Sequence, residues 1–417
     1  MAPPPPPQPK IAAPNSAPLT DDLVPMLPYL PEDLVIIEIL TRLPVKPLFK
    51  FRCVCKSWDS LFYEPRFLKR HVKLAQQKLL VNSRPIFLKS FQVSTLLGDK
   101  SCTNTQEFRF PISSHKPDVR IVGSCNGLVC LSICSRGNES ICFWNPSTKE
   151  AIRLPHIFSA QDCNVYGFGF DDSINDFKLV RAFADPSGEA DWKAFNVEIY
   201  RVFNRSMKKI ANFPSGFPYS RREGILLNGA LHTLGLNIES SVENGVETKT
   251  STWSIVALDL ATETFRHVPQ PDQFDDGGFK AEEMSMGLYR VGDSLCLVRG
   301  FHEAFGDVWV MKQYGVEESW VKLVRIPLGA VTASPYMLRV KPVYFSEKYG
   351  QLLIIVRDKL YSYNPKENVF RVVNLHGVNL RSKFFIQFSN HVDSLYSPSM
   401  MKGLRSGRQP HYMNLEG

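Results

Sequence analysis

The chain has 417 residues, 44% of them apolar, and a formal net charge of +8. This length accommodates two domains, and this apolar content is ordinary for a globular protein. The chain opens without a charged-then-apolar signal sequence, and no apolar run approaches the ~20 residues of a membrane span, so we expect a soluble protein of the cytoplasm and/or nucleus that binds no membrane.

Residues 1–27 open with PPPPPQP and show almost no apolar periodicity. A proline-rich tract of this kind is extended and cannot bury a core, so we expect a disordered tail. A ligand for proline-binding domains is the alternative interpretation of the same residues.

The segment from Leu30 to Phe62 predicts three short helices. Pro31 suits a first helical position, acidic residues follow in the first turn, and Pro44 and Pro47 end that helix and restart the chain. The first helix is apolar on nearly all sides, and the segment is too small to sustain a core by itself. It therefore needs a partner surface, which indicates recruitment rather than catalysis.

The arrangement LP-EDL-x3-EIL-x2-LP-x3-L-x2-F-x-CVCKSW resembles the F-box over the whole length of that motif. A helical subdomain packed on the rest of the chain is the alternative interpretation. The resemblance implies that the following positions form the F-box core or bind an SKP-type adaptor: Leu30, Pro31, Leu34, Ile37, Leu40, Leu43, Pro44, Leu48, Val54, Cys55, Lys56 and Trp58.

An excess of positive charge lies on and just after these helices. Between Arg42 and Lys73 there are nine Lys or Arg residues against Asp59 and Glu64. The basic residues are not interleaved with aromatic residues in a stacking pattern, so we expect a solvated face near an acidic protein partner and no binding of nucleic acid.

Nine cysteines, an odd number, are typical of free thiols in a reducing compartment. Cys125, Cys130, Cys134 and Cys142 lie in one stretch, but no two of them are spaced as C-x2-C and no histidine lies among them. Their apolar neighbours predict buried strand thiols, so we expect neither a metal site nor a cofactor.

From about residue 80 the chain changes to short apolar runs separated by turns, which is typical of all-β domains. One phrase recurs, made of a strand, a polar turn, a second strand and usually a final Pro or Gly. Steps of 56, 58, 52 and 53 residues separate the last bulky residues before its turns, which are Trp144, Tyr200, Leu258, Val310 and Tyr363. A period near ~50 residues is that of kelch-like propeller blades.

Between these phrases lie further pairs of strands, joined by turns such as Asn126-Gly127 and Asn228-Gly229 that need positive φ. Strands left over at roughly 79–111 and 384–396 could complete a sixth blade from both ends of the domain and so protect its edges. The expected fold is therefore multidomain, with a small all-α F-box of three short helices followed by an all-β propeller of kelch type with about six blades.

The β-rich part resembles the F-box-associated, kelch-like domain of plant F-box proteins across nearly all of residues 80–397. The phrases GSCNGLVCL, FWNPSTKE-x-IRLP and YGFGFDDSINDFKLV carry the resemblance. The double-glycine motif of standard kelch repeats is absent, so "kelch" describes the architecture alone. The expected domains are the tail (1–27), the F-box with a connecting helical segment (28–78), the propeller (79–397) and a second disordered tail (398–417).

No motif of reactive chemistry accompanies these domains, since the sequence contains no P-loop, G-x-S-x-G elbow, H-E-x-x-H or dinucleotide fingerprint. The acidic run from Asp171 to Asp176 lacks the glycine and the terminal glutamate of a calcium loop, and a turn between strands explains it. The histidines are scattered, and His232 and His267 could meet only through the fold. We expect no catalytic residue, no metal and no enzyme activity.

The two resemblances imply a substrate-recognition subunit of an SKP–cullin–F-box ubiquitin ligase. The F-box would bind the SKP adaptor, and through it the cullin and RING subunits, while the propeller would hold a target protein for ubiquitination and proteasomal degradation. Two alternatives stay open: the propeller is a glycan- or ligand-binding receptor, or the chain is an F-box scaffold that leads to no degradation.

Target binding is expected in the loops of one propeller rim, which are the least patterned part of the sequence. The longest expected loops are residues 185–195, 237–252, 269–283 and 301–307. Their apolar residues Trp192, Phe274, Phe279 and Phe301 are the candidate target anchors. Packing of these side chains onto the propeller itself is the alternative interpretation.

Overall fold

The computed structural model describes residues 34–83, 87–97, 105–110, 118–135, 138–155, 163–184, 195–214, 217–218, 224–243, 246–271, 284–301, 305–327, 340–356, 359–375, 378 and 387–398. The chain divides into two compact units, the first ending at Thr41 and the second beginning at Arg42. Within the described residues, no helix is both long enough and apolar enough to span a membrane.

The described end of the first unit is helical but irregular. After Leu34 the chain forms a π-helical turn, η1 (Val35–Ile39), followed by a 3-10 turn, η2 (Leu40–Arg42). The hydroxyl of Thr41 donates a hydrogen bond to the carbonyl oxygen of Ile37 at 2.6 Å. A threonine hydroxyl that bonds the carbonyl oxygen four residues earlier competes with the backbone hydrogen bond to that oxygen. In this protein, the bond occurs where the helix departs from regular α-helical geometry.

Three regular helices follow in the second unit: α2 (Val45–Phe51), α3 (Lys56–Leu61) and α4 (Pro65–Leu74). Pro44 is the N-cap of α2, and Pro65 occupies the first turn of α4, where a missing amide hydrogen costs nothing. The buried His71 of α4 hydrogen-bonds the carbonyl oxygen of Leu43 at 3.0 Å. The short helices expected after Pro44 are therefore confirmed.

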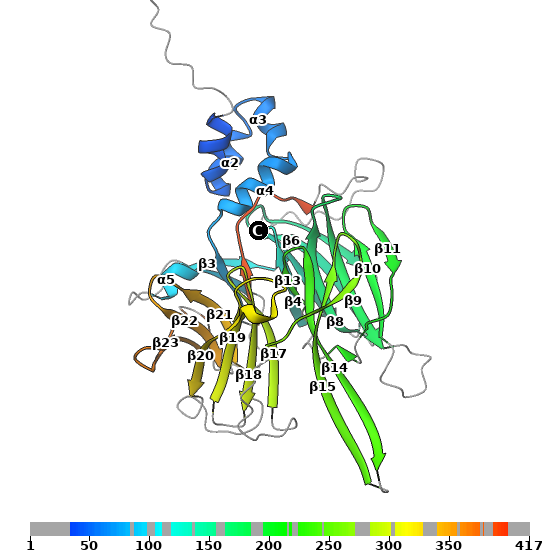
Figure 1. Cartoon of the computed structure of the whole chain (residues 1–417). Coiled ribbons are helices and arrows are strands. Elements are labelled where there is room, and N and C mark those ends of the chain that lie inside the picture. Colours follow the sequence, from blue (N-terminus) through cyan, green and yellow to red (C-terminus); the bar gives the residue numbers. More distant parts are fainter. Residues whose placement is uncertain are drawn as a thin grey trace, which may run out of the picture. The chain divides into compact units, whose positions relative to one another are not determined.

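The strands of the second unit form six sheets, which are the blades of a propeller. Each is a run of antiparallel strands, and Figure 1 follows them in chain order by colour. Blade 1 contains β25 (Gln387–His391), β1 (Lys78–Ser83), β2 (Phe87–Gln92) and β3 (Thr105–Arg109), with a short helix α5 (Val93–Leu96) after β2. Blade 2 contains β4 (Asp118–Cys125), β5 (Leu128–Ser135), β6 (Asn138–Asn145) and β7 (Glu150–Pro155).

The other four blades follow along the chain. Blade 3 contains β8 (Cys163–Asp171), β9 (Asp176–Ala184), β10 (Phe195–Arg201) and β11 (Ser206–Lys209). Blade 4 contains β12 (Phe217–Pro218), β13 (Ile225–Leu227), β14 (Ala230–Glu243), β15 (Val246–Asp259) and β16 (Phe265–Val268). Blade 5 contains β17 (Met284–Val291), β18 (Ser294–Phe301), β19 (Phe305–Met311) and β20 (Trp320–Pro327), with a 3-10 turn η4 (Glu317–Ser319) before β20. Blade 6 contains β21 (Val340–Ser346), β22 (Gln351–Val356), β23 (Lys359–Asn364) and β24 (Val369–Val372).

Blade 1 closes the ring with strands from both ends of the domain. Its first strand, β25, comes from the C-terminal end and pairs with β1, with Leu80 opposite Ser389. Across the closure, the ammonium group of Lys341 in β21 donates to the carbonyl oxygen of Phe388 in β25 at 3.0 Å. The first strands of neighbouring blades also contact one another. The expected completion of a sixth blade by the leftover strands is confirmed, and a closed ring leaves only short, protected edges.

The apolar core lies between the blades. Leu80 and Phe108 of blade 1 pack with Val129 and Trp144 of blade 2. Comparable clusters join blades 3 and 4, 4 and 5, 5 and 6, and 6 and 1. Between blades 2 and 3, the rings of Phe143 and Phe168 lie 5.5 Å apart. Since each blade buries both faces against its neighbours, the ring is stabilised as a whole.

Two segments that were predicted to be loops contain strands, so these predictions are wrong. Residues 237–252 were expected to be a loop, but β14 and β15 pair continuously from Ala230↔Asp259 to Glu243↔Val246. The polar side chains there hid the strands, because strands are recognised from apolar alternation, which needs one buried face. Phe301 is also no loop residue, since it ends β18 and pairs with Phe305 of β19.

Candidate functional site

Exposed apolar side chains mark the described end of the first unit. Leu34 is 50% exposed, and Ile37 and Ile39 are also exposed, while Leu40 is buried. Scattered single apolar residues on a surface are normal, but three within six residues form a local concentration. This segment therefore offers an apolar contact surface.

Helices α2, α3 and α4 have a core and an exposed turn of their own. Leu48 of α2 is fully buried, and the rings of Phe62 and Phe67 lie 5.4 Å apart. Between α2 and α3 the chain is exposed, with Val54 at 62%. Trp58 is partly buried and meets Phe51 edge-on, with ring centroids 5.8 Å apart.

The structure separates the residues named from the motif into groups. Leu40 and Leu48 are buried, and Leu43 and Trp58 are partly buried. Leu30 and Pro31 lie outside the described residues. The exposed members are Leu34, Ile37, Pro44, Val54, Cys55 and Lys56. Among the described members, the exposed large apolar side chains of Leu34, Ile37 and Val54 are the candidates for docking.

The propeller has two unlike rims. Because the strands of a blade are antiparallel, the turns from first to second and from third to fourth strand lie at one end, which we call the turn rim. The connections from second to third strand, and from blade to blade, lie at the other end, which we call the loop rim. All positive-φ residues of the described chain lie in turns of the turn rim, from Asn126 and Gly127 to Asn368. That rim is built of tight turns with special backbone geometry, as expected from the Asn-Gly signals.

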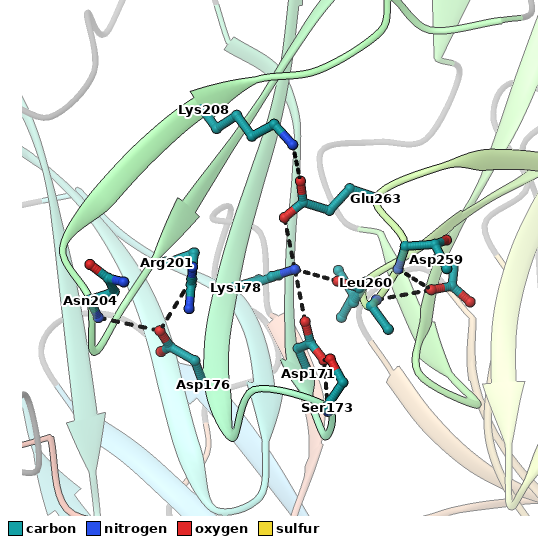
Figure 2. A network of polar contacts seen from close by, with 12 residues as sticks. Asp171, Ser173, Asp176, Lys178, Arg201, Asn204, Lys208, Asp259, Leu260 and Glu263 are labelled. Carbon is teal, nitrogen blue, oxygen red and sulfur yellow. Dashed lines mark hydrogen bonds and ion pairs between the residues drawn. The ribbon is translucent and has the colours of Figure 1, made fainter.

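At the turn rim, the buried ammonium group of Lys178 links blades 3 and 4 (Figure 2). The ammonium group of Lys178 in β9 lies 2.8 Å from a carboxylate oxygen of Asp171 and 2.9 Å from one of Glu263, and it also donates to the carbonyl oxygen of Leu260. Glu263 binds Lys208 as well, at 2.7 Å. Burial opposes ionisation of Asp171 and Glu263, but the hydrogen bonds from the lysines outweigh it and lower the pKa of both carboxyls.

The acidic run from Asp171 to Asp176 forms the expected turn between strands. Asp171 and Asp176 are buried, while Asp172 is exposed. Asp171 is bonded to the buried ammonium group, and the carboxylate of Asp176 accepts hydrogen bonds from the backbone amides of Phe203 and Asn204.

One of the four candidate target anchors lies among the described residues. Trp192, Phe274 and Phe279 lie outside the described residues. Phe301 ends β18, where its backbone pairs with Phe305 of β19. The four therefore stay predictions, with Phe301 moved from a loop to a strand end.

Several cysteine and histidine side chains are buried, among them Cys125, Cys142 and His232. Burial raises the pKa of the Cys125 and Cys142 thiols to about 12 each, so they are unreactive packing residues. His232 bonds the carbonyl oxygen of Ile225 at 3.1 Å and the hydroxyl of Tyr314 at 2.5 Å, not His267. No group of three or more potential metal ligands occurs within the described residues.

Family comparisons agree with the two-part architecture. The model of the F-box domain matches residues 27–70, and that of the F-box associated beta propeller domain matches residues 79–402. The chain is an F-box protein of the F-box-associated β-propeller family. An Arabidopsis thaliana F-box/kelch-repeat protein is 30% identical over 305 residues, covering 70% of this chain and 78% of that protein. A further Arabidopsis thaliana F-box protein is 27% identical over 84% of this chain and 89% of its own length.

Likeness to solved structures is weaker. The SapL1 lectin matches 71% of this F-box protein and 95% of its own chain, with a TM-score of 0.37 and 8% identity.

The structure explains two residues in the motif phrases of this F-box protein. In the FWNPSTKE phrase, the buried amide of Asn145 donates to the carbonyl oxygens of Ser394 at 2.9 Å and Tyr396 at 2.7 Å, while its own oxygen accepts from the amide of Ser147. It therefore ties blade 2 to the segment that follows β25. In the YGFGF phrase, a Cβ at Gly167 would lie 2.6 Å from Leu231, so blade 4 packs where only glycine leaves room.

Two features of the structure were not predicted from the sequence. The sequence predicted no role for Lys178, and its partner Glu263 is 85 residues away, so no local signal could have found the contact. The long hairpin of β14 and β15 was missed for the reason given above. Its signal is the run after Asn244-Gly245, a dipeptide that favours hairpins, with Thr248, Thr250 and Thr252 at alternate positions.

Proposed function

We propose that this F-box protein is a substrate-recognition subunit of an SKP–cullin–F-box ubiquitin ligase, in which the F-box binds the SKP adaptor and the propeller holds a target protein. One observation supports it most strongly. A segment that matches the F-box domain displays Leu34, Ile37 and Val54 outward while burying Leu40 and Leu48. Apolar side chains that a domain keeps exposed are those that a partner can bury.

The proposed mechanism is positional. The adaptor, with its cullin and RING partners, would hold a ubiquitin-charged conjugating enzyme, and the propeller would keep lysines of the target near it. A raised effective concentration then drives transfer, with no catalytic group needed in this chain. The proposal places the complex in the cytoplasm and/or nucleus, supported by the free cysteines, which suit a reducing compartment.

The test is adaptor binding by purified full-length protein. Leu34→Asp and Val54→Asp should each weaken binding at least about tenfold, because each places a charge where an apolar contact forms. Val372→Asp is the matched control, since Val372 is 52% exposed but lies in β24 of the propeller. It should bind like the unaltered protein.

Circular dichroism of each variant checks that the fold is retained. Equal adaptor binding by all three variants, or no binding by the unaltered folded chain, would contradict the proposal. If the adaptor binds, the abundance of the target is then measured while the cullin is inhibited. A rise in abundance indicates a degradative receptor, and unchanged abundance indicates a scaffold.

A further inference from the structure

One strand pair of the propeller is much longer than the rest. β14 and β15 have 14 residues each, and the next longest described strands, β8 and β9, have nine. Figure 1 shows β14 and β15 running on past the ends of the other labelled strands. A blade needs only short strands to pack on its neighbours, so this hairpin is longer than its blade requires.

The blade's own pairing stops partway along this hairpin. Among the described strands, β16 pairs with β15 only from Ile255 to Leu258, and β12 pairs with β14 only at Leu236 and Gly235. From Asn237↔Thr252 to Glu243↔Val246 the hairpin is a ribbon of two strands. At ~3.4 Å per residue these seven pairs extend for roughly 20 Å.

The backbone geometry shows which residues of β15 point outward. The amide of Asp259 donates to Thr264, on the side of β16, whereas the amide of Leu260 donates to Gly229, on the other side. The carbonyl oxygen of Trp253 accepts from the side-chain amide of Gln270, again on the side of β16. Strand residues alternate in direction, and the register with β14 has no shift.

The backbone groups of Ser251, Lys249 and Glu247 therefore lie on the outer edge of β15, and those of the residues between them bond to β14. No described strand pairs with this edge beyond Ile255.

A two-stranded ribbon is marginally stable in water, and a third strand stabilises it. Proteins usually protect such edges with proline or several lysines, but this ribbon has no proline and a single lysine, Lys249. The ribbon is also acidic, with Glu239, Glu243 and Glu247 against that lysine, in a chain whose net charge is +8. The ribbon thus combines an open backbone edge with a net negative charge.

We infer that the outer edge of β15, from Ser251 to Glu247, binds an extended basic segment of the target protein as an added strand. The inference rests on the proposed function, because it assigns the propeller's partner class. Backbone hydrogen bonds to the edge supply affinity in this mode, and the acidic ribbon favours Lys- and Arg-rich segments over acidic ones.

The probe is a fluorescein-labelled ten-residue peptide of alternating Lys and Thr, titrated with full-length protein and followed by anisotropy. Its acidic counterpart, alternating Glu and Thr, is the control peptide. We expect the basic peptide to bind at least about tenfold more tightly, and N-methylation of its alternate amides to remove binding.

The edge itself is tested with Ser251→Pro against Ser251→Ala. Proline removes an outward amide hydrogen without removing a bond to β14, so Ser251→Pro should weaken peptide binding about tenfold and Ser251→Ala should not change it. A triple variant, Glu239→Gln with Glu243→Gln and Glu247→Gln, should reduce the preference for the basic peptide. Circular dichroism checks that each variant keeps its strand content.

Several outcomes would overturn the inference: no peptide binding, equal binding of both peptides, or binding by Ser251→Pro equal to that of Ser251→Ala. A dimer in sedimentation that Ser251→Pro converts to monomer would show that a second copy occupies the edge instead. Adaptor binding is measured on the same samples. If it is retained while the peptide fails to bind, the inference fails and the proposed function stands.

Discussion

At the scale of single residues, the least expected feature is an ammonium group in the protein interior. Lys178 is 2% exposed and binds two carboxylates and a carbonyl. Because a buried charge is costly without partners, Asp171, Glu263 and Lys178 depend on one another. Their contacts join the turn after β8 to the turn after β15, and so hold two blades in register at the turn rim.

Lys178→Met removes this cation and keeps the length of the side chain. We expect it to lower the free energy of unfolding by about 3–5 kcal/mol, because two partly or fully buried carboxylates lose their partner. Chemical denaturation of the purified protein measures the change. Lys208→Met is the matched control, because Lys208 binds the same Glu263 at 2.7 Å but its side chain is 69% exposed.

An exposed ion pair contributes less than about 1 kcal/mol, so the control should unfold almost like the unaltered protein. Similar losses of unfolding free energy in the two variants would show that burial does not govern how much this ion network stabilises the protein.

At the scale of elements, closure of the ring depends on a strand from the far end of the chain. β25 pairs with β1, and the segment after it is anchored by Asn145 at the end of β6. Asn364 occupies the equivalent position at the end of β23 in blade 6, where, among the described residues, its side-chain oxygen accepts a local bond from the amide of Lys366. Two similar Asn-Pro turns therefore have different structural roles.

Asn145→Ala should leave the carbonyl oxygens of Ser394 and Tyr396 without their donor and cost about 1–3 kcal/mol of unfolding free energy. The closing segment should then be cleaved faster in limited proteolysis, with mass spectrometry locating the cuts after residue 386. Asn364→Ala should show no such acceleration. Equal cleavage of both variants would indicate that Asn145 does not anchor the closure.

At the scale of the whole molecule, inter-blade packing buries neutral histidines in separate parts of the ring. Burial lowers the pKa of His232 in blade 4 and of His391 in blade 1 to about 4 each. Both values lie below the ordinary pKa of about 6.5, so protons bind the unfolded chain more strongly than the folded one. Stability contributed by keeping them neutral is complete above pH 6.5 and is lost as the pH falls toward 4.

We therefore expect the free energy of unfolding to fall between pH 6.5 and pH 4, by up to about 1.4 kcal/mol per pH unit for each histidine. Urea unfolding at a series of pH values measures this slope. His232→Gln should reduce the slope, because an amide does not titrate. The lowered pKa values of Asp171 and Glu263 act in a different window, since their contribution is lost only below about pH 4.5. A flat profile from pH 6.5 to pH 4.5 would contradict the prediction.

The sequence by itself determined what depends on neighbours along the chain. Asn126-Gly127 and Asn228-Gly229 predicted turns correctly because positive φ is a property of those residues, and both have it. The recurring phrase predicted the blades because each blade repeats the same local pattern of buried strands and polar turns. The F-box motif likewise identified its helices, since their spacing of apolar residues is local.

Tertiary structure decided what depends on residues far apart or on solvent. Whether Leu34 and Leu40 face outward or inward follows from packing, because both are leucines in one helical run. Lys178 became a buried cation only because blade 4 brings Glu263 beside it. The ribbon of β14 and β15 was hidden because its strands lie beyond the core and need no apolar alternation, so only backbone pairing reveals them.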